Sequence, residues 1–520
     1  MRLIVVHHHF RPGGVRRVIE LAAPHLVAAL QPRVRELILV GGERPDPAWL
    51  RACRGLTGDV PVTCRVHAAM GYLAEQRRAP ATVFRQLRKF LGAVIAEGPA
   101  GGTVVWAHNL GLGRNLLLNR ALIGECEARG VALMLHHHDW WFENRWQRWP
   151  EMRASGFRTL TAVARAILPT DSTVRHLAIN QMDTAVLKRH FDGQAEWMPN
   201  LAEPGTAPSS EEIDRARRWL RWRLDDEGPV WLIPCRLLRR KNVAEAVLLA
   251  RWLRPEAWLV TTGGTSSTEE RPYAEALRKA GETHRWRLRL GVLQGGEAGQ
   301  PSVAALLGVS EVVLLTSLQE GFGLPYLEAS LSHRPLLARR LPNIAPDLAR
   351  FGFRFPQAYD EILVDPALFD WKAELGRQRG RWVAWKAAQP RAVRPMTGLP
   401  ALLALNTPGP VPFSRLTLRA QIEVLRQPPE VSWRCCAPLN PFLERWRRHA
   451  AAGQLRSSPW PRTAGRWLGG QAYAARFVEA LRTPAASAIG PESGLACQTE
   501  FLRAKLADPW LYPLLWTSLP

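Results

Sequence analysis

Short apolar runs alternate with helix-patterned segments in two successive halves of this chain, and this alternation limits the folds open to it. In the first half, strand-like runs occupy residues 2–6, 37–40, 103–107, 132–136 and 164–169. The pattern restarts with runs at residues 230–234, 257–262, 287–292, 311–316 and 335–338. Because strands that alternate with helices form parallel sheets covered on both faces, we predict an α/β protein.

A linker separates the two halves. Residues 197–210 read WMPNLAEPGTAPSS and are rich in Pro, Gly and Ser. We therefore predict two Rossmann-like domains that face each other, over residues 1–200 and 201–370, with ligands bound beyond the carboxyl ends of the strands. A mostly helical extension would follow over residues 371–520, and its segment 471–481 is a candidate for a helix that returns to the first domain.

The segment SLQEGFGLPYLEASLSHRP, residues 317–335, carries the strongest chemical signal. Glu320 follows an apolar strand and precedes a glycine turn, and Pro325 suits the first turn of a helix that contains Glu328. Two carboxylates, which accept hydrogen bonds from sugar and ribose hydroxyls, thus lie near a helix N-terminus that can receive an anion. From the spacing alone, a helix cap and a surface residue explain these glutamates equally well.

Two other segments carry groups suited to a phosphate. Arg236 and Lys241, within PCRLLRRKN, follow a buried strand, and cations in such a loop bind a diphosphate and stabilise it as it leaves. Basic residues are abundant, so a surface role is the main alternative. Gly13 and Gly14 precede a helix and permit close approach of the backbone to a phosphate or sugar, although a simple turn is an equal interpretation.

Histidines follow two strands of the first domain. His136 and His138 share one strand face, as do His7 and His9, and His108 ends another strand. Such pairs can bind a metal, but no Cys or Glu/His helical pair completes a ligand set. We therefore predict no metal, and we favour hydrogen bonds from these side chains to a sugar.

Together these segments resemble the family 4 glycosyltransferases of the GT-B fold. Glu320 and Glu328 meet the family's E-x7-E pattern inside EGFGLPYLEA. Arg236 and Lys241 meet its paired Arg and Lys, and the glycine pair at residues 13–14 meets its early glycines. The resemblance spans roughly residues 1–350.

The resemblance implies retaining transfer of a sugar, as in a hexosyltransferase, from a nucleotide-sugar donor to an acceptor that the sequence does not specify. The donor is a substrate, and no cofactor or metal is expected. In the family's pattern Arg236 and Lys241 would bind the diphosphate, Glu328 would hold the ribose, and His138 would lie near the reacting sugar. Glu320 would contact the donor sugar.

Backbone groups complete the site that the resemblance implies. The N–H groups of Phe322, Gly323 and Leu324 would contact the donor sugar, and Gly13 and Gly14 would lie under the phosphates. The family often has a glycine-containing loop after the strand at residues 335–338, whereas this chain has RRLPNIAPDLARFG. Contacts that this loop makes with the donor are therefore not predicted.

The charge of the chain leaves other functions open. The net charge is +23, and 21 basic against 8 acidic residues follow Trp371. Such an excess favours nucleotides, polyanions or anionic lipid surfaces. The alternatives to a glycosyltransferase are a sugar phosphorylase of the same fold and a non-catalytic protein that binds membranes or polyanions. No nucleic-acid motif is present, so we expect no nucleic-acid partner.

The cysteines and the N-terminus predict a cytoplasmic protein. Seven scattered cysteines without a C-x-x-C pair are typical of a reducing compartment. The first apolar run, MRLIVV, is too short for a signal peptide. A peripheral contact with the anionic inner face of a membrane is left open.

Overall fold

The chain forms two compact units, each built around one parallel sheet. The computed structural model describes residues 1–97, 102–143, 148–205, 207–265, 268–295, 299–405, 407–484, 489–506 and 515–516. Unit 1 comprises residues 1–203, 389–396 and 463–505, and unit 2 comprises residues 204–388 and 397–462 with the described part of 506–520. The chain passes between the units at residues 203–204, inside the segment rich in Pro, Gly and Ser.

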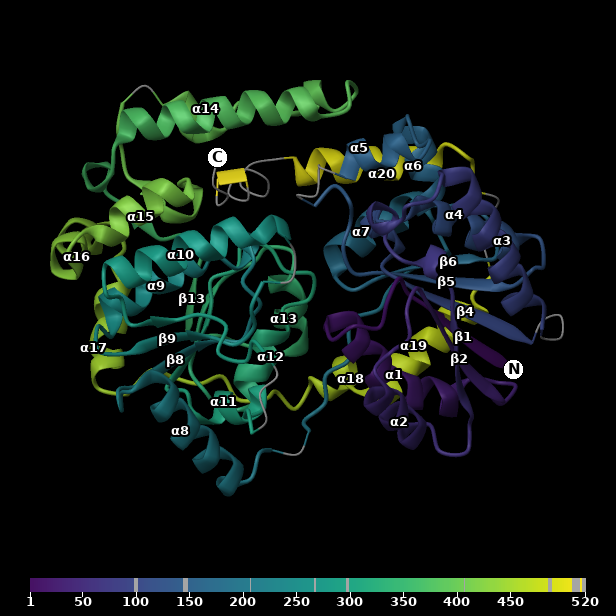
Figure 1. Ribbon diagram of the computed structural model, residues 1–520, viewed down its shortest axis with the longest axis horizontal. Coiled ribbons are helices and arrows are strands. Elements are labelled where there is room, and N and C mark those ends of the chain that lie inside the picture. The colour runs from purple at the N-terminus through teal and green to yellow at the C-terminus, as the bar shows by residue number, and fades with distance from the viewer. Residues whose placement is uncertain are drawn as a thin grey trace. The chain divides into compact units, whose positions relative to one another are not determined.

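Within the described residues, the sheet of unit 1 has seven parallel strands in the order β3-β2-β1-β4-β5-β6-β7 (Figure 1). The strands are β1 (Arg2–Val6), β2 (Glu36–Gly41), β3 (Val62–Val66), β4 (Thr103–His108), β5 (Ala132–His137), β6 (Val174–Ala178) and β7 (Ala195–Trp197). The strand order reverses between β1 and β4. At such a switch point the loops diverge and leave room for a ligand beyond the carboxyl ends of the strands.

One predicted strand of this unit is wrong. Residues 164–169 fall mostly in helix α6 (Leu160–Ile167), because the Thr159 side chain accepts a hydrogen bond from the Ala162 backbone N–H and caps a helix there. Val163 and Ile167 then lie buried on one helical face. A short apolar run fits a buried strand or a buried helix equally well, so the apolar pattern alone did not decide between them.

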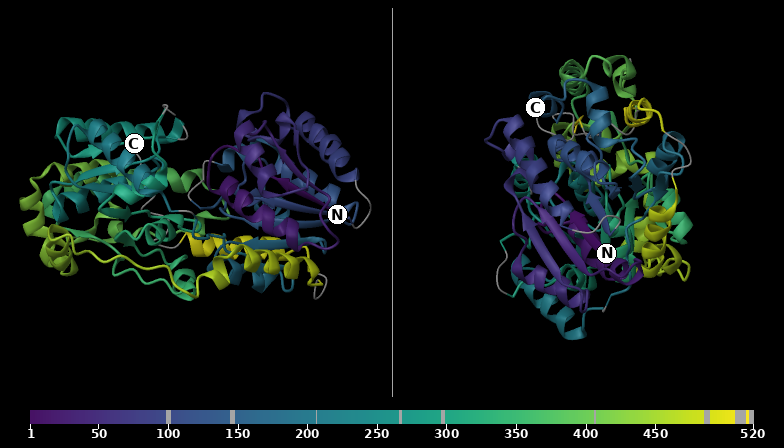
Figure 2. Two further views of the ribbon diagram at one scale, coloured as in Figure 1. Left: turned by 90° about the horizontal axis from the view of Figure 1, so that it is seen from below. Right: turned by 90° about the vertical axis from the view of Figure 1, so that its right-hand side faces the viewer.

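Helices cover both faces of this sheet. They are α1 (Gly14–Ala29), α2 (Pro47–Leu56), α3 (Pro80–Ala96), α4 (Leu116–Glu127), α5 (Arg148–Ala154), α6, α7 (Gln181–His190), α18 (Gly465–Leu468), α19 (Gly470–Arg482) and α20 (Ser493–Lys505). α1 and α19 lie side by side, and α20 lies along α6 and α7 (Figures 1 and 2). Trp106 of β4 packs against Phe477 of α19, with ring centroids 5.8 Å apart.

Within the described part of unit 2, six parallel strands follow the order β10-β9-β8-β11-β12-β13. They are β8 (Val230–Ile233), β9 (Trp258–Thr261), β10 (Leu288–Arg289), β11 (Val312–Leu315), β12 (Leu336–Arg339) and β13 (Gln357–Tyr359). Two short strands later in the chain, β14 (Leu363–Val364) and β15 (Val411–Pro412), form a separate antiparallel pair. The strand order reverses between β8 and β11, so the switch point of unit 2 lies there.

The helices of unit 2 are α8 (Ser210–Leu224), α9 (Val243–Leu253), α10 (Arg271–Thr283), α11 (Val303–Val309), α12 (Leu324–Leu331), α13 (Ala345–Phe351), α14 (Trp371–Ala388), α15 (Leu418–Arg426), α16 (Pro429–Cys436) and α17 (Phe442–Ala451).

A buried ionic network ties helix α9 to the sheet of unit 2. Arg339 of β12 donates to both carboxylate oxygens of Glu245 in α9 at 2.6 Å. The Tyr359 hydroxyl donates to the same carboxylate at 2.6 Å, so Arg339 and Tyr359 both hold the buried Glu245 carboxylate.

The C-terminal third divides between the units instead of forming one extension. α14 to α17 belong to unit 2, where the Trp252 ring of α9 donates to the Ser432 hydroxyl of α16 at 2.9 Å. α18 to α20 belong to unit 1, where the half-buried Lys505 lies 2.7 Å from a Glu143 oxygen and 3.2 Å from an Asp183 oxygen. The predicted extension over residues 371–520 is therefore split, because its first helices pack on unit 2 and its last helices pack on unit 1.

No helix in the described part of the chain is both long and apolar enough to cross a bilayer.

Candidate functional site

The switch point of unit 2 brings together two residues that are 79 positions apart in sequence. Lys241 lies in the loop after β8, and Glu320 lies in the loop after the neighbouring strand β11. The Lys241 ammonium group forms a short ion pair with one carboxylate oxygen of Glu320. The Thr316 hydroxyl fixes the two loops against each other, because it donates to the Lys241 carbonyl oxygen at 3.0 Å.

A second cation completes this cluster. Arg240 lies 2.9 Å from the other carboxylate oxygen of Glu320 and also donates to the Gln319 carbonyl oxygen at 2.8 Å. Burial raises the pKa of the Glu320 carboxyl, but the charges of Lys241 and Arg240 and their hydrogen bonds outweigh it and bring the pKa to about 2. Glu320 is therefore ionised at neutral pH, and two cations surround one carboxylate.

A helix N-terminus opens directly after Glu320. Gly323 has φ 78°, and an added Cβ would lie 2.8 Å from the Tyr326 ring, so only glycine fits this turn. No described residue accepts a hydrogen bond from the backbone N–H groups of Phe322, Gly323 or Leu324. These three donors at the start of α12 are available to an anion.

The remaining predicted residues of unit 2 lie around this cluster. Arg236 is exposed in the loop after β8, and a Cβ added to Gly263 would lie 3.2 Å from its Cγ. Glu328 is half-buried on α12. The structure thus joins Lys241 to Glu320 directly. Arg236 lies on the same loop as Lys241, and Glu328 lies on α12, the helix that follows Glu320.

Sequence reasoning missed two residues of the cluster. Arg240 was hidden among the consecutive cations of LLRRK, where only the turn at residues 239–241 decides which side chain faces Glu320. Asn343 lies in the loop after β12 for which no contact was predicted, and its amide donates to the Glu320 carbonyl oxygen at 2.8 Å. The Asn343 Oδ1 atom is buried and has no partner among the described residues, which leaves an acceptor beside the cluster.

In unit 1, Gly13 and Gly14 are exposed at the start of α1. Gly13 has φ 166° and ψ 176°, an extended conformation, and precedes the helix. A Cβ added to Gly14 would have no atom within 4 Å. Nothing within unit 1 therefore requires glycine at position 14, and the surface above it is open.

His138 lies in a row of histidines along the carboxyl edge of the unit 1 sheet. It is 8% exposed, and its Nε2 atom lies 3.0 Å from Nδ1 of His108. His136 lies beside both, and His7 lies on the next strand, where its Nδ1 donates to the His108 carbonyl oxygen at 3.1 Å. Burial lowers the pKa of His138 to about 4 and holds the pKa values of His7, His108 and His136 well below the usual range. These imidazoles are neutral at pH 7.

Tryptophans that follow β5 pack inside unit 1. Trp140 is 1% exposed and its ring donates to an Asp183 carboxylate oxygen at 2.9 Å. Trp141 is fully buried and donates to Gln498 of α20 at 3.3 Å. Both therefore belong to the core, while residues 144–147 of the same Trp-rich stretch lie outside the described residues.

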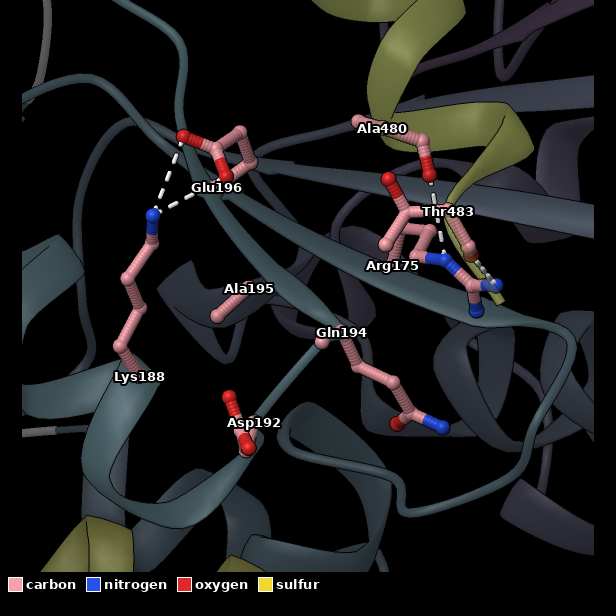
Figure 3. A pocket seen from close by; sticks show the side chains of 9 residues that line it. Arg175, Lys188, Asp192, Gln194, Ala195, Glu196, Ala480 and Thr483 are labelled. Carbon is pink, nitrogen blue, oxygen red and sulfur yellow. Dashed lines mark hydrogen bonds and ion pairs between the residues drawn. The ribbon is translucent and has the colours of Figure 1, made fainter. Parts of the chain in front are cut away.

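A cavity of about 200 Å³ lies at the β6–β7 edge of unit 1 (Figure 3). Arg175 in its wall donates to the Ala480 and Thr483 carbonyl oxygens at 3.2 and 2.6 Å, and Lys188 lies 3.0 Å from Glu196 (Figure 3). The Arg175 guanidinium thus binds the end of α19 to the sheet, and Lys188 and Glu196 pair with each other across the cavity wall.

The comparisons with known proteins identify one curated relative. No family model matches the chain. Mannosylglucosyl-3-phosphoglycerate synthase from Petrotoga mobilis is 23% identical over 359 residues, which are 66% of this chain. The matched part spans 65% of the length of that relative.

Solved structures with a similar fold include proteins of sugar transfer. The Anabaena protein HepE in complex with UDP and glucose is 14% identical and covers 92% of this chain and 99% of its own, with a TM-score of 0.46. A glycosyltransferase from Rickettsia africae is 11% identical over 92% of this chain and 97% of its own, with a TM-score of 0.49. Glycosyltransferases thus recur among the matches, as the motif resemblance predicts, but at TM-scores below 0.5 these likenesses carry no argument for function.

Proposed function

We propose that the chain is a retaining glycosyltransferase that moves a hexose from a nucleotide-sugar donor to an acceptor. The observation that carries this proposal is the cluster of Lys241, Arg240 and Glu320 at the switch point of unit 2, next to the open N-terminus of α12. The E-x7-E spacing of Glu320 and Glu328 and the name of the curated relative support the same reading.

The charge balance of the cluster suits a diphosphate. Two cations face one ionised carboxylate, which leaves one positive charge in excess. The N–H groups of Phe322, Gly323 and Leu324, which have no acceptor among the described residues, add the positive end of the α12 dipole. The exposed Arg236 supplies a further cation on the same loop. Charge-assisted hydrogen bonds from such groups bind phosphate oxygens strongly.

The same groups would promote the reaction. The bond from the sugar C1 to the donor phosphate breaks, the bond from C1 to the acceptor oxygen forms on the same face, and the acceptor proton passes to the leaving diphosphate. Negative charge grows on the diphosphate, where Lys241 and Arg240 stabilise it without a metal at that position. Glu320 is a positioning residue in this account, because it holds both cations and keeps its charge at neutral pH.

The roles of Glu328 and the glycine pair rest on the family resemblance. Glu328 would hold the ribose hydroxyls, and its half-buried position on α12 leaves its carboxylate within reach of solvent. In that resemblance Gly13 and Gly14 would lie under the phosphates. The acceptor is not proposed.

The setting of this activity is also a proposal. We infer a cytoplasmic protein, since all seven cysteines are free and five of them are buried.

The basic helix α14 supports a peripheral contact with an anionic membrane, because it carries five cations against one glutamate and exposes 55% of Val383. Sedimentation with phosphatidylglycerol vesicles but not with phosphatidylcholine vesicles is the expected result, and equal sedimentation with both would contradict it.

A donor screen tests the proposed transfer. UDP-, GDP- and ADP-sugars are incubated with the full chain without added magnesium or manganese, and released nucleoside diphosphate is measured. We expect slow hydrolysis or transfer from one donor class, with NMR showing the same anomeric configuration in donor and product. Phosphate-dependent release of a sugar phosphate from a disaccharide would instead identify a phosphorylase, and nucleotide binding without turnover would identify a non-catalytic protein.

A further inference from the structure

Three histidines of unit 1 converge at the carboxyl edge of its sheet. His108 ends β4, and His136 and His138 lie at the end of β5, which pairs with β4 so that His108 and His136 are direct neighbours. One ring nitrogen from each residue lies within 4.8 Å of the other two, and all three side chains are buried. Sequence reasoning paired His136 with His138 and His7 with His9, but it did not join His108 to either pair, because His108 lies on another strand, 30 residues before His138.

The hydrogen bonds of His136 fix which of its nitrogens carries the lone pair. Its Nε2 atom lies 3.3 Å from the Met198 carbonyl oxygen, which can only accept, so Nε2 carries the proton. The lone pair is therefore on Nδ1, where it accepts a hydrogen bond from the Tyr473 hydroxyl at 3.4 Å, and a metal ion bound to Nδ1 would replace this bond. A metal-binding histidine typically has this arrangement, with its other nitrogen donating to a backbone carbonyl that holds the ring in place.

The hydrogen bonding of His108 and His138 is incomplete. Their Nδ1 and Nε2 atoms lie 3.0 Å apart, so one of the two nitrogens carries a proton if no ion lies between them. The other His108 nitrogen, Nε2, is buried without a partner in the described part of the chain. An ion held by His108 Nδ1 and His138 Nε2 would remove the need for a shared proton between these two nitrogens.

A second histidine pair on the opposite face of the same sheet shows what a purely structural pair looks like. His137 Nε2 lies 3.1 Å from His176 Nδ1, and His176 Nε2 donates to the Pro169 carbonyl oxygen at 3.0 Å. This chain of hydrogen bonds runs in one direction and ends on a carbonyl. The lone pair on His137 Nδ1 is buried without a partner among the described residues, but no third ligand side chain of that part of the chain converges on it. His108, His136 and His138 differ because three rings converge on one point.

We propose that His108, His136 and His138 bind one divalent transition metal ion in unit 1. In a tetrahedral zinc site, nitrogens at about 2.0–2.1 Å from the ion lie about 3.3–3.4 Å apart, so ring rotations that shorten the present separations of up to 4.8 Å would bring all three onto one ion. Three imidazole ligands suit zinc, cobalt, nickel or copper, whereas magnesium and calcium prefer oxygen ligands. Three protein ligands leave a fourth position open to water or a substrate oxygen. The inference goes beyond the proposed transfer, since it rests on unit 1 alone.

Cobalt titration of the full chain tests this site without any nucleotide. Chelator-treated protein is titrated with Co²⁺, the visible d–d absorption is followed, and Zn²⁺ is then added as a competitor. We expect one Co²⁺ per chain with the spectrum of a four-coordinate nitrogen site, displacement by Zn²⁺, and no competition by Mg²⁺. Absence of Co²⁺ and Zn²⁺ binding by the folded wild type at micromolar concentrations would overturn the proposal, whatever the donor screen shows.

Matched variants locate the ion. His108→Gln and His136→Gln should each weaken Co²⁺ binding at least tenfold, whereas His137→Gln, which is equally buried on the opposite face of β5, should bind Co²⁺ like the wild type. An equal loss in His137→Gln would contradict the assignment. X-ray absorption of the zinc-loaded wild type needs no variant: imidazole scattering from three ligands is expected, and a shell containing sulfur would overturn the site.

Discussion

The two units share an architecture but carry different chemistry at the carboxyl edges of their sheets. In unit 2 the loops at the switch point hold Lys241, Arg240 and Glu320, which are charged and paired. In unit 1 the corresponding edge carries His108 and His138, whose pKa values are lowered by burial so that both rings are neutral. One edge therefore suits a phosphate, and the other suits a metal or a hydroxyl group.

This difference shows that the loops and not the sheets set the chemistry of each unit. Both sheets reverse their strand order at one point, and in both the polar residues gather there. The fold supplies the position, while function depends on which side chains the loops bring to it. The following predictions test this contrast between a charged edge and a neutral edge.

The largest effect is expected for Lys241→Ala. Removing a buried cation that stabilises the leaving diphosphate should lower the transfer rate by about a hundredfold to a thousandfold. The control is Lys188→Ala in unit 1, an exposed lysine paired with the exposed Glu196, which should leave the rate unchanged. Equal rates for Lys241→Ala and the wild type would remove the charged edge from the reaction.

Arg339→Met should destabilise unit 2 selectively. It leaves Glu245 buried without its cation, which costs about 3–5 kcal/mol, whereas Arg340→Met removes only an exposed pair with Asp360 and costs less than about 1 kcal/mol. Hydrogen exchange measured by mass spectrometry should show faster exchange in peptides of β12 and α9 and unchanged exchange in the β1 and β4 peptides. Uniformly faster exchange in both units would mean that they unfold as one.

Glu320→Gln should cost roughly 3 kcal/mol of stability at pH 7, since the pKa of Glu320 falls from 4.5 to about 2 on folding. A lowered pKa stabilises the fold above the unfolded value, and this stability is lost as the pH falls from about 4.5 towards 2. The difference in thermal midpoint between wild type and variant should therefore be constant from pH 8 to about 5 and shrink below that. A difference that grows on acidification would contradict the ion pair.

Gly14→Ala should give the smallest effect on stability and a separable effect on transfer. Because the added methyl group has open space, the variant should be as stable as the wild type or more stable by about 0.5 kcal/mol. If phosphates lie against this backbone, the KM for the donor should nevertheless rise. Chemical denaturation and donor kinetics on the same sample separate the two, and an unchanged KM would leave Gly13 and Gly14 as a simple turn.

The sequence predicts much of this molecule because its strands are apolar and regularly spaced. Alternation alone located four strands of unit 1 and five of unit 2, and the loops after β8 and β11 were recognised from Lys241 and Glu320. It could not choose between a strand and a helix at residues 164–169, where only the Thr159 cap decides. It also could not find Arg240, Asn343 or the partner of His136 on β4, because strand register and turn geometry bring them together only in three dimensions.

Calorimetric titration of UDP, GDP and ADP into the full chain, with no added metal, tests the central claim most directly. We expect binding of one nucleoside diphosphate at a single site, weakened at least tenfold by Lys241→Ala and unaffected by Lys188→Ala. Binding of equal strength in wild type and Lys241→Ala, or no binding of any of the three, would contradict a diphosphate site at the charged edge of unit 2.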